Sequence, residues 1–211
     1  MNSNEKEKKK DPPPTIFPEV SDDPKAYGIS LYRTLDEETA SEIIQALLIF
    51  NECDHAAAPE DPDNSKSPVK EVTYKPINFY ISTWGGDARE MFAIYDIMRA
   101  VRKENNIVTY GIGKVMSAGV LLLAAGTKGQ RKIGKNCRVM IHSVSGDQVG
   151  ALHNLENEME EIRWIQNQHI EALVEETSMT KKQLKSLLNR KVNVYLDATE
   201  AVKYGIADII I

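Results

Sequence analysis

Three apolar segments alternate with helical patterns in the middle of the chain, and this alternation restricts its fold more than any other feature. Residues 77–82, 107–112 and 138–142 are short runs rich in β-branched and aromatic residues, which is typical of buried strands. A helical pattern follows the first run over 85–101, and a Leu- and Ala-rich pattern follows the second. Strands joined through helices need right-handed crossovers, so we expect an α/β fold with a largely parallel sheet.

The rest of the sequence predicts one domain with a tail and an insertion. The first residues are charged and then proline-rich, so residues 1–24 are expected to be disordered or extended. Residues 25–211 are expected to form a single domain, because a chain of 211 residues with 42% hydrophobic content supports one sizeable core. A polar, proline-rich stretch over 54–71 is predicted to be a loop insertion.

Helices are also predicted on either side of the alternating segments. Before them, Thr34 and Glu37 show the spacing of a capping box, which predicts a helix start after a short strand at 29–33. After them, apolar residues recur at helical spacing from about 148 to 177, more than twice the length of an average helix. Such a helix must project from a small domain or pack on another copy. A further helix is expected near 181–188.

Composition argues against several classes of partner. The net charge is −5, which does not favour nucleic acid or an anionic membrane. No apolar run approaches the length of a membrane span. The two cysteines, Cys53 and Cys137, lack metal-binding spacing and are expected to be reduced thiols. The sequence therefore predicts a cytoplasmic protein with no metal and no cofactor.

Ser117 stands between the predicted strand at 107–112 and the Leu/Ala-rich helix, and two interpretations of it are open. Serine is common as a helix N-cap, so the hydroxyl could serve only that purpose. A hydroxyl held at a fixed turn could also be a nucleophile. In that case the N–H groups of Ser117 and Ala118 are expected to be unpaired donors at the start of a helix.

A base for such a serine can be sought among the four histidines. His55 lies in the polar insertion, while His153 and His169 lie in the long helix, where exposure to solvent is the default expectation. His142 ends an apolar strand, and sites in parallel sheets gather at the carboxyl ends of strands. Gly85–Gly86 also ends a strand, where a glycine N–H can point at a substrate oxygen; a plain turn explains the pair equally well.

The segments ISTWGG, AIYDIMR, GKVMSAGVLLLAAGTKGQRKIGKNCRVMIH and LDATEAVKYGIADII resemble the ClpP family, the proteolytic subunits of Clp serine peptidases. The resemblance covers residues 77–211 well and 29–51 more loosely. It implies a ClpP/crotonase-like superhelical fold of βαβ units with a projecting helical handle over about 148–188. It also implies Ser117 as nucleophile, His142 as base, and the N–H groups of Gly86 and Ala118 as the oxyanion hole.

The resemblance further implies partners. Such subunits form homo-oligomers, heptameric rings that are often stacked as tetradecamers with proteolysis inside. They receive unfolded polypeptides from an AAA+ ATPase. A long helix with an exposed apolar stripe is consistent with contacts between subunits.

The sequence departs from the family where the third triad residue, an aspartate, is expected. That position is Asn193 here, and the arginine that usually precedes it is Val192. An asparagine oxygen can accept a hydrogen bond from the histidine but carries no charge to stabilise the imidazolium. Asp197 could substitute, although with Glu200 it also forms a capping-box pattern. Trp84 replaces the proline of the family's SPGG motif, and Lys114 could be considered as an alternative base.

Three functions therefore remain open from the sequence. The first is a Ser/His endopeptidase with Asn193 in the third position. The second is a weakly active or inactive ring subunit with a structural or regulatory role, which Asn193 motivates. The third is an acyl-CoA enzyme on the related crotonase fold, against which the MSAG and VMIH segments argue.

Overall fold

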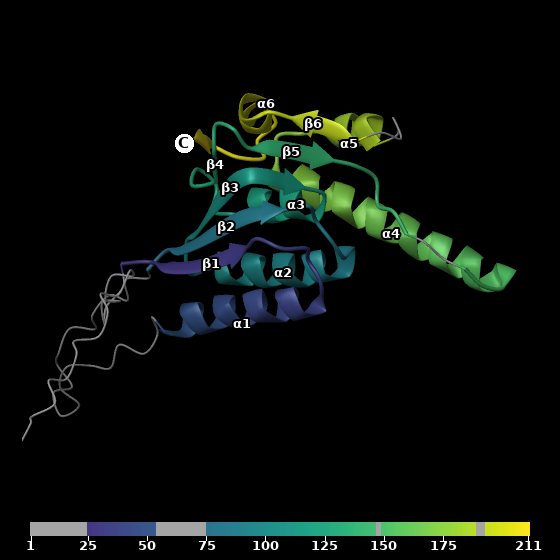
Figure 1. The fold of residues 1–211 in the computed structure, drawn as a ribbon, viewed down its shortest axis with the longest axis horizontal. Helices are drawn as coiled ribbons and strands as arrows, with labels where there is room; N and C mark the ends of the chain where they lie inside the picture. Colours follow the sequence, from purple (N-terminus) through teal and green to yellow (C-terminus); the bar gives the residue numbers. More distant parts are fainter. Residues whose placement is uncertain (1–24, 54–74, 147–148, 189–192) are drawn as a thin grey trace, which may run out of the picture.

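The computed structural model describes residues 25–53, 75–146, 149–188 and 193–211 (Figure 1). The predicted tail over 1–24 and the predicted insertion over 54–71 lie outside the described residues. The described residues form one seven-stranded sheet. Its strands are β1 (Tyr27–Leu31), β2 (Ile77–Thr83), β3 (Ile107–Met116), β4 (Lys132–Ile133), β5 (Arg138–Ile141), β6 (Val194–Leu196) and β7 (Ile209–Ile210).

The sheet is parallel except at one strand. The order β1-β2-β3-β4-β7 consists of parallel pairs, and β5 pairs in parallel with the second half of β3. Only β6 runs antiparallel, against β5. The predicted α/β class with a largely parallel sheet is thereby confirmed. The central strand β3 is longer than expected, because it continues past residue 112 to Met116 and pairs there with Met140.

Six helices complete the described residues. Figure 1 shows α1 and α2 side by side on one face of the sheet, with α3 close to β3 in the interior. Every residue of α3 is buried, so the segment after Ser117 is a rigid part of the core. The bounds are α1 (Glu37–Cys53), α2 (Ala88–Val101), α3 (Ala118–Ala124), α4 (Leu152–Glu176), α5 (Lys181–Leu188) and α6 (Ala198–Lys203).

The start of α1 differs from the prediction. Asp36 Oδ1 accepts a hydrogen bond from the Thr39 N–H at 2.9 Å, so Asp36 is the capping residue of this helix. The predicted capping box of Thr34 and Glu37 is therefore wrong. Glu37 is already the first helical residue, and an aspartate directly before it can reach the free N–H groups of the first turn.

The long helix α4 has two different halves. Its C-terminal half packs on the core through Ile170, Ala172 and Leu173. Its N-terminal half projects from the body of the molecule in Figure 1, and Leu152 there is 72% exposed. The chain thus has the projecting helical element that the resemblance implied. In the described part of the chain, none of the helices combines the length and apolar character needed to cross a bilayer.

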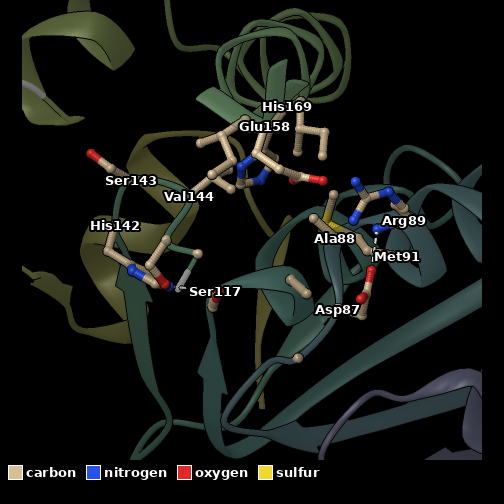
Figure 2. Close-up of a pocket in the computed structure, with 16 residues that line it drawn as sticks. Asp87, Ala88, Arg89, Met91, Ser117, His142, Ser143, Val144, Glu158 and His169 are labelled. Carbon is tan, nitrogen blue, oxygen red and sulfur yellow. Dashed lines mark hydrogen bonds between the residues drawn. The ribbon is translucent and has the colours of Figure 1, made fainter. Parts of the chain in front are cut away.

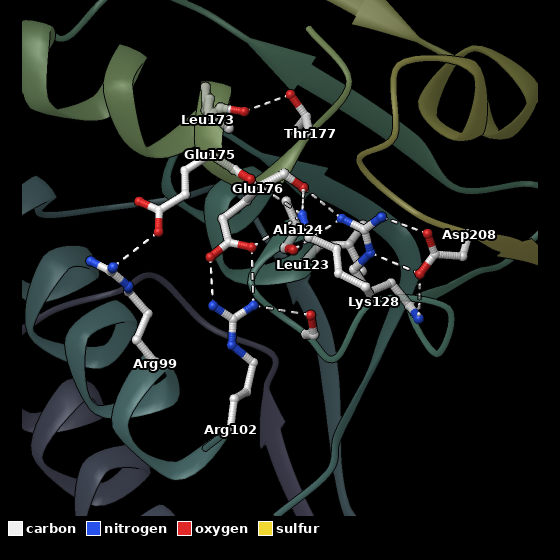
Figure 3. A network of polar contacts seen from close by, with 12 residues as sticks. Arg99, Arg102, Leu123, Ala124, Lys128, Leu173, Glu175, Glu176, Thr177 and Asp208 are labelled. Atoms are coloured by element: carbon white, nitrogen blue, oxygen red, sulfur yellow. Dashed lines mark hydrogen bonds and ion pairs between the residues drawn. The ribbon is translucent and has the colours of Figure 1, made fainter.

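An ion-pair network holds the C-terminal end of α4 to the body (Figure 3). Both carboxylate oxygens of Glu176 accept hydrogen bonds from Arg102, the residue directly after α2, at 2.6 and 3.0 Å. Arg131 donates to the Glu176 carbonyl oxygen at 2.7 Å and forms an ion pair with Asp208. Glu176 and Arg131 are both buried. The network therefore joins the end of α2, the end of α4 and the C-terminal segment through the interior.

Candidate active site

Ser117 lies on a strained turn directly after β3. Its backbone has φ 54° and ψ −121°, and among the described residues it is the one non-glycine with positive φ. Such a conformation is unfavourable for a residue with a Cβ and persists only where the surrounding structure enforces it. Here the Ser117 N–H donates to the Met140 carbonyl at 2.8 Å, which extends the pairing of β3 with β5. The turn is thus held from the β5 side and by the buried helix α3 behind it.

Two expectations about Ser117 are corrected by this geometry. Its N–H is not an unpaired donor, because Met140 accepts it. Its hydroxyl forms no capping hydrogen bond with α3, so the interpretation of Ser117 as a side-chain cap is wrong. The hydroxyl is directed elsewhere, toward His142.

His142 follows the last residue of β5, one strand away from Ser117. The two side chains meet with 2.7 Å between Ser117 Oγ and His142 Nε2 (Figure 2). Parallel pairing of β3 with β5 places the carboxyl ends of both strands at the same edge of the sheet. Burial lowers the pKa of His142 below its ordinary value, so the imidazole is neutral near pH 7. A neutral imidazole at this distance is able to accept the hydroxyl proton.

Gly85 and Gly86 form the opposite side of the site. A Cβ on Gly85 would lie 2.5 Å from Ser117 Cβ, and a Cβ on Gly86 would lie 2.0 Å from the Leu35 carbonyl oxygen. Both residues have positive φ, so only glycine fits at either position. Hydrogen bonds from the Leu35 N–H to Gly85 O and from the Asp87 N–H to Leu35 O hold this loop in place.

Two backbone N–H groups beside Ser117 are available as donors. The Gly86 N–H has no partner among the described residues, although its neighbours on both sides are hydrogen-bonded. Ala118 is the first residue of α3, where an N–H has no acceptor within the helix. Gly86, Ala118, Ser117 and His142 all line one cavity of about 170 Å³. The structure thus brings together four of the five site residues predicted from the sequence.

The fifth residue, Asn193, lies nearby without a contact to the histidine. Val194 pairs with Ile141 across β5 and β6, so the next position along each strand places Asn193 beside His142. Asn193 is nevertheless exposed, and no hydrogen bond joins the two described side chains. Asp197 caps α6 instead of contacting His142. Its Oδ1 accepts a hydrogen bond from the Glu200 N–H at 2.8 Å, and Glu200 Oε2 accepts one from the Asp197 N–H at 2.9 Å. The predicted capping box at these two residues is confirmed.

Two further residues singled out from the sequence lie at the edge of the site. Trp84 is 66% exposed, next to the two glycines. The Lys114 ammonium lies 5.3 Å from the centre of the Trp84 indole, within the range of a cation–π contact. The structure therefore pairs the Lys114 amine with Trp84, while His142 is the nitrogen base that contacts Ser117.

His169 was missed by the sequence analysis. It was expected to be exposed on the long helix, but it is 6% exposed and lines the same cavity as Ser117 and His142. Burial, and to a lesser extent the proximity of His142, lower the pKa of His169 to about 4. The signal was present in the spacing, because residues 165, 169 and 173 recur every four positions on one face of a helix. Across the described ranges, no cluster of three or more His, Cys, Asp or Glu side chains is suited to holding a metal ion.

Comparisons with known proteins bear on this arrangement. The sequence pattern of the family described as Clp protease matches residues 69–211, which include the whole of the site. The chain is also 32% identical over 183 residues to a protein of Prochlorococcus marinus named ATP-dependent Clp protease proteolytic subunit 1. That similarity covers 87% of this chain and 83% of the relative.

Proposed function

Because this chain belongs to the Clp protease family, we propose that it is a serine endopeptidase subunit in which Ser117 is the nucleophile and His142 the general base. The family is one of peptidases, as the resemblance implied. The observation that carries the assignment of roles is the 2.7 Å contact between Ser117 Oγ and His142 Nε2 at a strained turn. Two available N–H groups and a cavity next to this contact supply an oxyanion hole and room for a substrate.

The proposed reaction forms and breaks an ester on Ser117. As Ser117 Oγ attacks the peptide carbonyl carbon, His142 Nε2 takes the hydroxyl proton. The resulting oxyanion accepts hydrogen bonds from the N–H groups of Gly86 and Ala118. His142 then gives its proton to the leaving amine, and the acyl-enzyme remains. Water attacks this ester with His142 again as base, which releases the carboxylic acid and restores the serine.

A fluorophosphonate probe tests this proposal directly, because it forms a covalent bond only with an activated serine. We expect the probe to label Ser117, with the labelled residue located by mass spectrometry of the digested protein. Labelling should disappear in the presence of a peptide aldehyde that occupies the same site. Failure to label Ser117 under conditions that fully label a known serine peptidase would overturn the assignment.

A second function is favoured by one observation. Asn193 is exposed and makes no hydrogen bond with His142, and among the described residues no carboxylate is bonded to His142 to stabilise the imidazolium. On this basis the alternative is a weakly active ring subunit with a structural or regulatory role. Turnover of unstructured peptides by the purified chain at the rate of an ordinary member of the family would exclude this alternative.

Asn193→Asp discriminates between these functions and carries a pH signature. A carboxylate beside His142 favours the imidazolium and therefore raises the pKa of His142. The acidic limb of the pH profile of kcat/KM reports the protonation of His142 in the free enzyme. This limb should therefore move to higher pH in the variant. In the wild-type chain this limb should lie below the position for an ordinary histidine, because burial lowers the pKa of His142. We also expect kcat at pH 8 to rise by about 10- to 10⁴-fold, since an Asp-to-Asn change in a serine triad costs about 10⁴-fold.

The matched control for this variant is Asn136→Asp. Asn136 is also exposed, but it precedes β5, at the opposite end of that strand from His142. The Asn136→Asp substitution adds the same charge far from His142, so it should leave the pH profile of kcat/KM unchanged. An unchanged profile in Asn193→Asp would show that residue 193 does not interact with His142.

Gly86→Ala tests the proposed oxyanion hole. Its Cβ would meet the Leu35 carbonyl carbon at 2.7 Å and the oxygen at 2.0 Å, so the loop must move and carry its N–H away from the site. Loss of one oxyanion donor lowers kcat by about 10²- to 10³-fold. The control is Gly28→Ala on β1, where an added Cβ meets nothing within 4 Å. Circular dichroism establishes that both variants are folded; unchanged turnover in folded Gly86→Ala would contradict the assignment.

The proposal includes assembly and a partner. The relative's name describes an ATP-dependent protease, which supports an AAA+ ATPase as the source of unfolded polypeptide for this chain. The exposed apolar residues on the projecting part of α4, Leu152 and Met159, support contacts between subunits of stacked heptameric rings. A cytoplasmic location is part of the same proposal. Mass photometry of the purified chain, with and without an ATPase, measures the assembly.

A further inference from the structure

The cavity beside Ser117 extends to α4, and the residues that close it there differ in polarity. Ile162 and Ile165 of α4 and Met91 of α2 supply apolar surface. His169 is the buried polar side chain among them, and Figure 2 shows its imidazole reaching from α4 toward the cavity. A peptide whose carbonyl carbon lies at Ser117 Oγ has its Cα one bond away, and the side chain of that residue begins at the next bond. That side chain is therefore the substrate group that can enter this cavity.

We propose that His169 determines the specificity of cleavage, by accepting or donating a hydrogen bond to an uncharged polar substrate side chain, such as that of glutamine, on the residue whose carbonyl is attacked. This inference rests on the proposed function. It goes beyond it by naming the class of side chain that the site prefers over aliphatic ones of similar size.

The first support is that His169 lacks a partner. Its Nε2 is shielded from solvent and makes no hydrogen bond with any described residue. Buried polar atoms are nearly always hydrogen-bonded. An unpaired nitrogen on a side chain that lines a cavity therefore indicates that a bound ligand supplies the hydrogen-bonding group. A site that uses such an atom discriminates strongly against a substrate without the matching group, because the atom is then left unpaired.

The second support is the charge state of the cavity wall. Burial and the neighbouring His142 keep the pKa of His169 near 4, so the ring is neutral at physiological pH. A neutral imidazole offers one N–H donor and one nitrogen acceptor, which matches an amide or a hydroxyl better than a carboxylate or an ammonium group. Three charged side chains also line the cavity, those of Asp87, Arg89 and Glu158. Arg89 is paired with Glu161 at 3.5 Å and is more than half exposed, and Asp87 caps α2. Glu158 lies in the N-terminal half of α4, whereas the buried His169 lies in its C-terminal half.

The third support is the rigidity of the adjoining wall. Gln166, one helical turn before His169, accepts a hydrogen bond through Oε1 from the Val144 N–H at 2.7 Å. This contact fastens to α4 the segment after His142, which includes the cavity residue Val144. The amide nitrogen of Gln166 is itself buried without a partner. Gln166 does not line the cavity itself, so His169 is the side chain with an unsatisfied polar atom that this anchored wall presents.

The test uses two peptidyl phosphonates that differ only in the side chain next to phosphorus, one of glutamine type and one of leucine type. Both react once with Ser117, so the measurement does not depend on rapid turnover. We expect the full chain to be inactivated faster by the glutamine-type compound, by about 10- to 100-fold for one hydrogen bond made in a desolvated pocket. His169→Leu should abolish or invert this ratio, and His169→Gln, which retains hydrogen-bonding groups, should keep part of it.

Two controls distinguish failure of the inference about His169 from failure of the proposed peptidase function. His153→Leu changes an exposed histidine of the same helix and should leave the ratio unchanged. A small fluorophosphonate without a peptide reports the reactivity of Ser117 in each variant, and the rates of both phosphonates are divided by its rate in the same variant. Equal reaction of the wild-type chain with both phosphonates, or the same ratio in His169→Leu, overturns the inference alone. Absence of any reaction, including that of the small probe, overturns the proposed function and the inference with it.

Discussion

Replacement of Ser117 by alanine is expected to lower kcat for peptide hydrolysis by about 10²- to 10⁵-fold, to the level left by binding and the oxyanion donors alone. A complete triad contributes about 10⁶-fold, and Asn193 already removes about 10- to 10⁴-fold of this. The expectation follows from the site geometry, in which Ser117 Oγ is the hydroxyl in contact with His142 Nε2. The measurement is the release of a fluorophore from an unstructured peptide, with active-site titration to correct for the fraction of reactive protein. Ser186→Ala, which removes an exposed hydroxyl on α5, serves as the matched control.

His142→Ala should lose nearly as much activity as Ser117→Ala, and the double variant should lose little more. Residues that act as a unit in one step are strongly non-additive, because either one alone disables the nucleophile. Residual activity of Ser117→Ala within 100-fold of the wild type would contradict the assignment of the nucleophile. Additive losses in the double variant would contradict the coupling of the two residues.

Glu176→Ala is expected to reduce the free energy of unfolding by about 3 to 5 kcal/mol, the range found when one member of a buried ion pair is removed. Its carboxylate receives the two hydrogen bonds from Arg102 (Figure 3), and Lys128 Nζ lies 3.2 Å from Oε2. The carboxylate also accepts a hydrogen bond from Tyr95 Oη at 3.1 Å. Removal leaves these cationic groups without a compensating charge at the end of α4. Urea unfolding followed by circular dichroism measures the loss.

Glu175→Ala is the matched control for this prediction. Glu175 is the neighbouring residue on α4 and forms an ion pair with Arg99 at 2.9 Å, but both side chains are about half exposed. An exposed pair contributes about 0 to 1 kcal/mol, so the control should change stability far less than Glu176→Ala. Equal effects of the two substitutions would show that burial of the network does not determine its contribution.

The same network predicts how the stability of the folded protein changes as the pH falls. Burial alone would raise the pKa of Glu176, but the hydrogen bonds and charges of Arg102 and Lys128 outweigh it and leave the pKa below its ordinary value. A carboxyl group with a lowered pKa contributes stability above its unfolded pKa, and this contribution is lost as the pH falls through the folded value. Glu176→Gln should therefore reduce the stability difference between pH 7 and acidic pH.

Local patterns in the sequence predicted the elements and the central pair of the site. The alternating apolar segments indicated the parallel sheet, and the carboxyl ends of its strands indicated Ser117 and His142 as neighbours. The capping box at Asp197 and Glu200 was also predictable, because it joins residues three positions apart. These features depend on spacing along one chain segment, and spacing is what a sequence displays directly.

Features that depend on how segments dock were decided only by the tertiary structure. The Ser117 N–H is occupied because β3 continues to pair with β5 as far as Met140, which no local pattern indicates. His169 is buried because the C-terminal half of α4 packs on the core beside His142, so its burial comes from residues far away in the chain. Glu176 meets Arg102 across 74 positions for the same reason. The sequence thus indicated which residues meet at the strand ends, while long-range packing decided which donors stay free and which buried polar side chain lines the cavity beside Ser117.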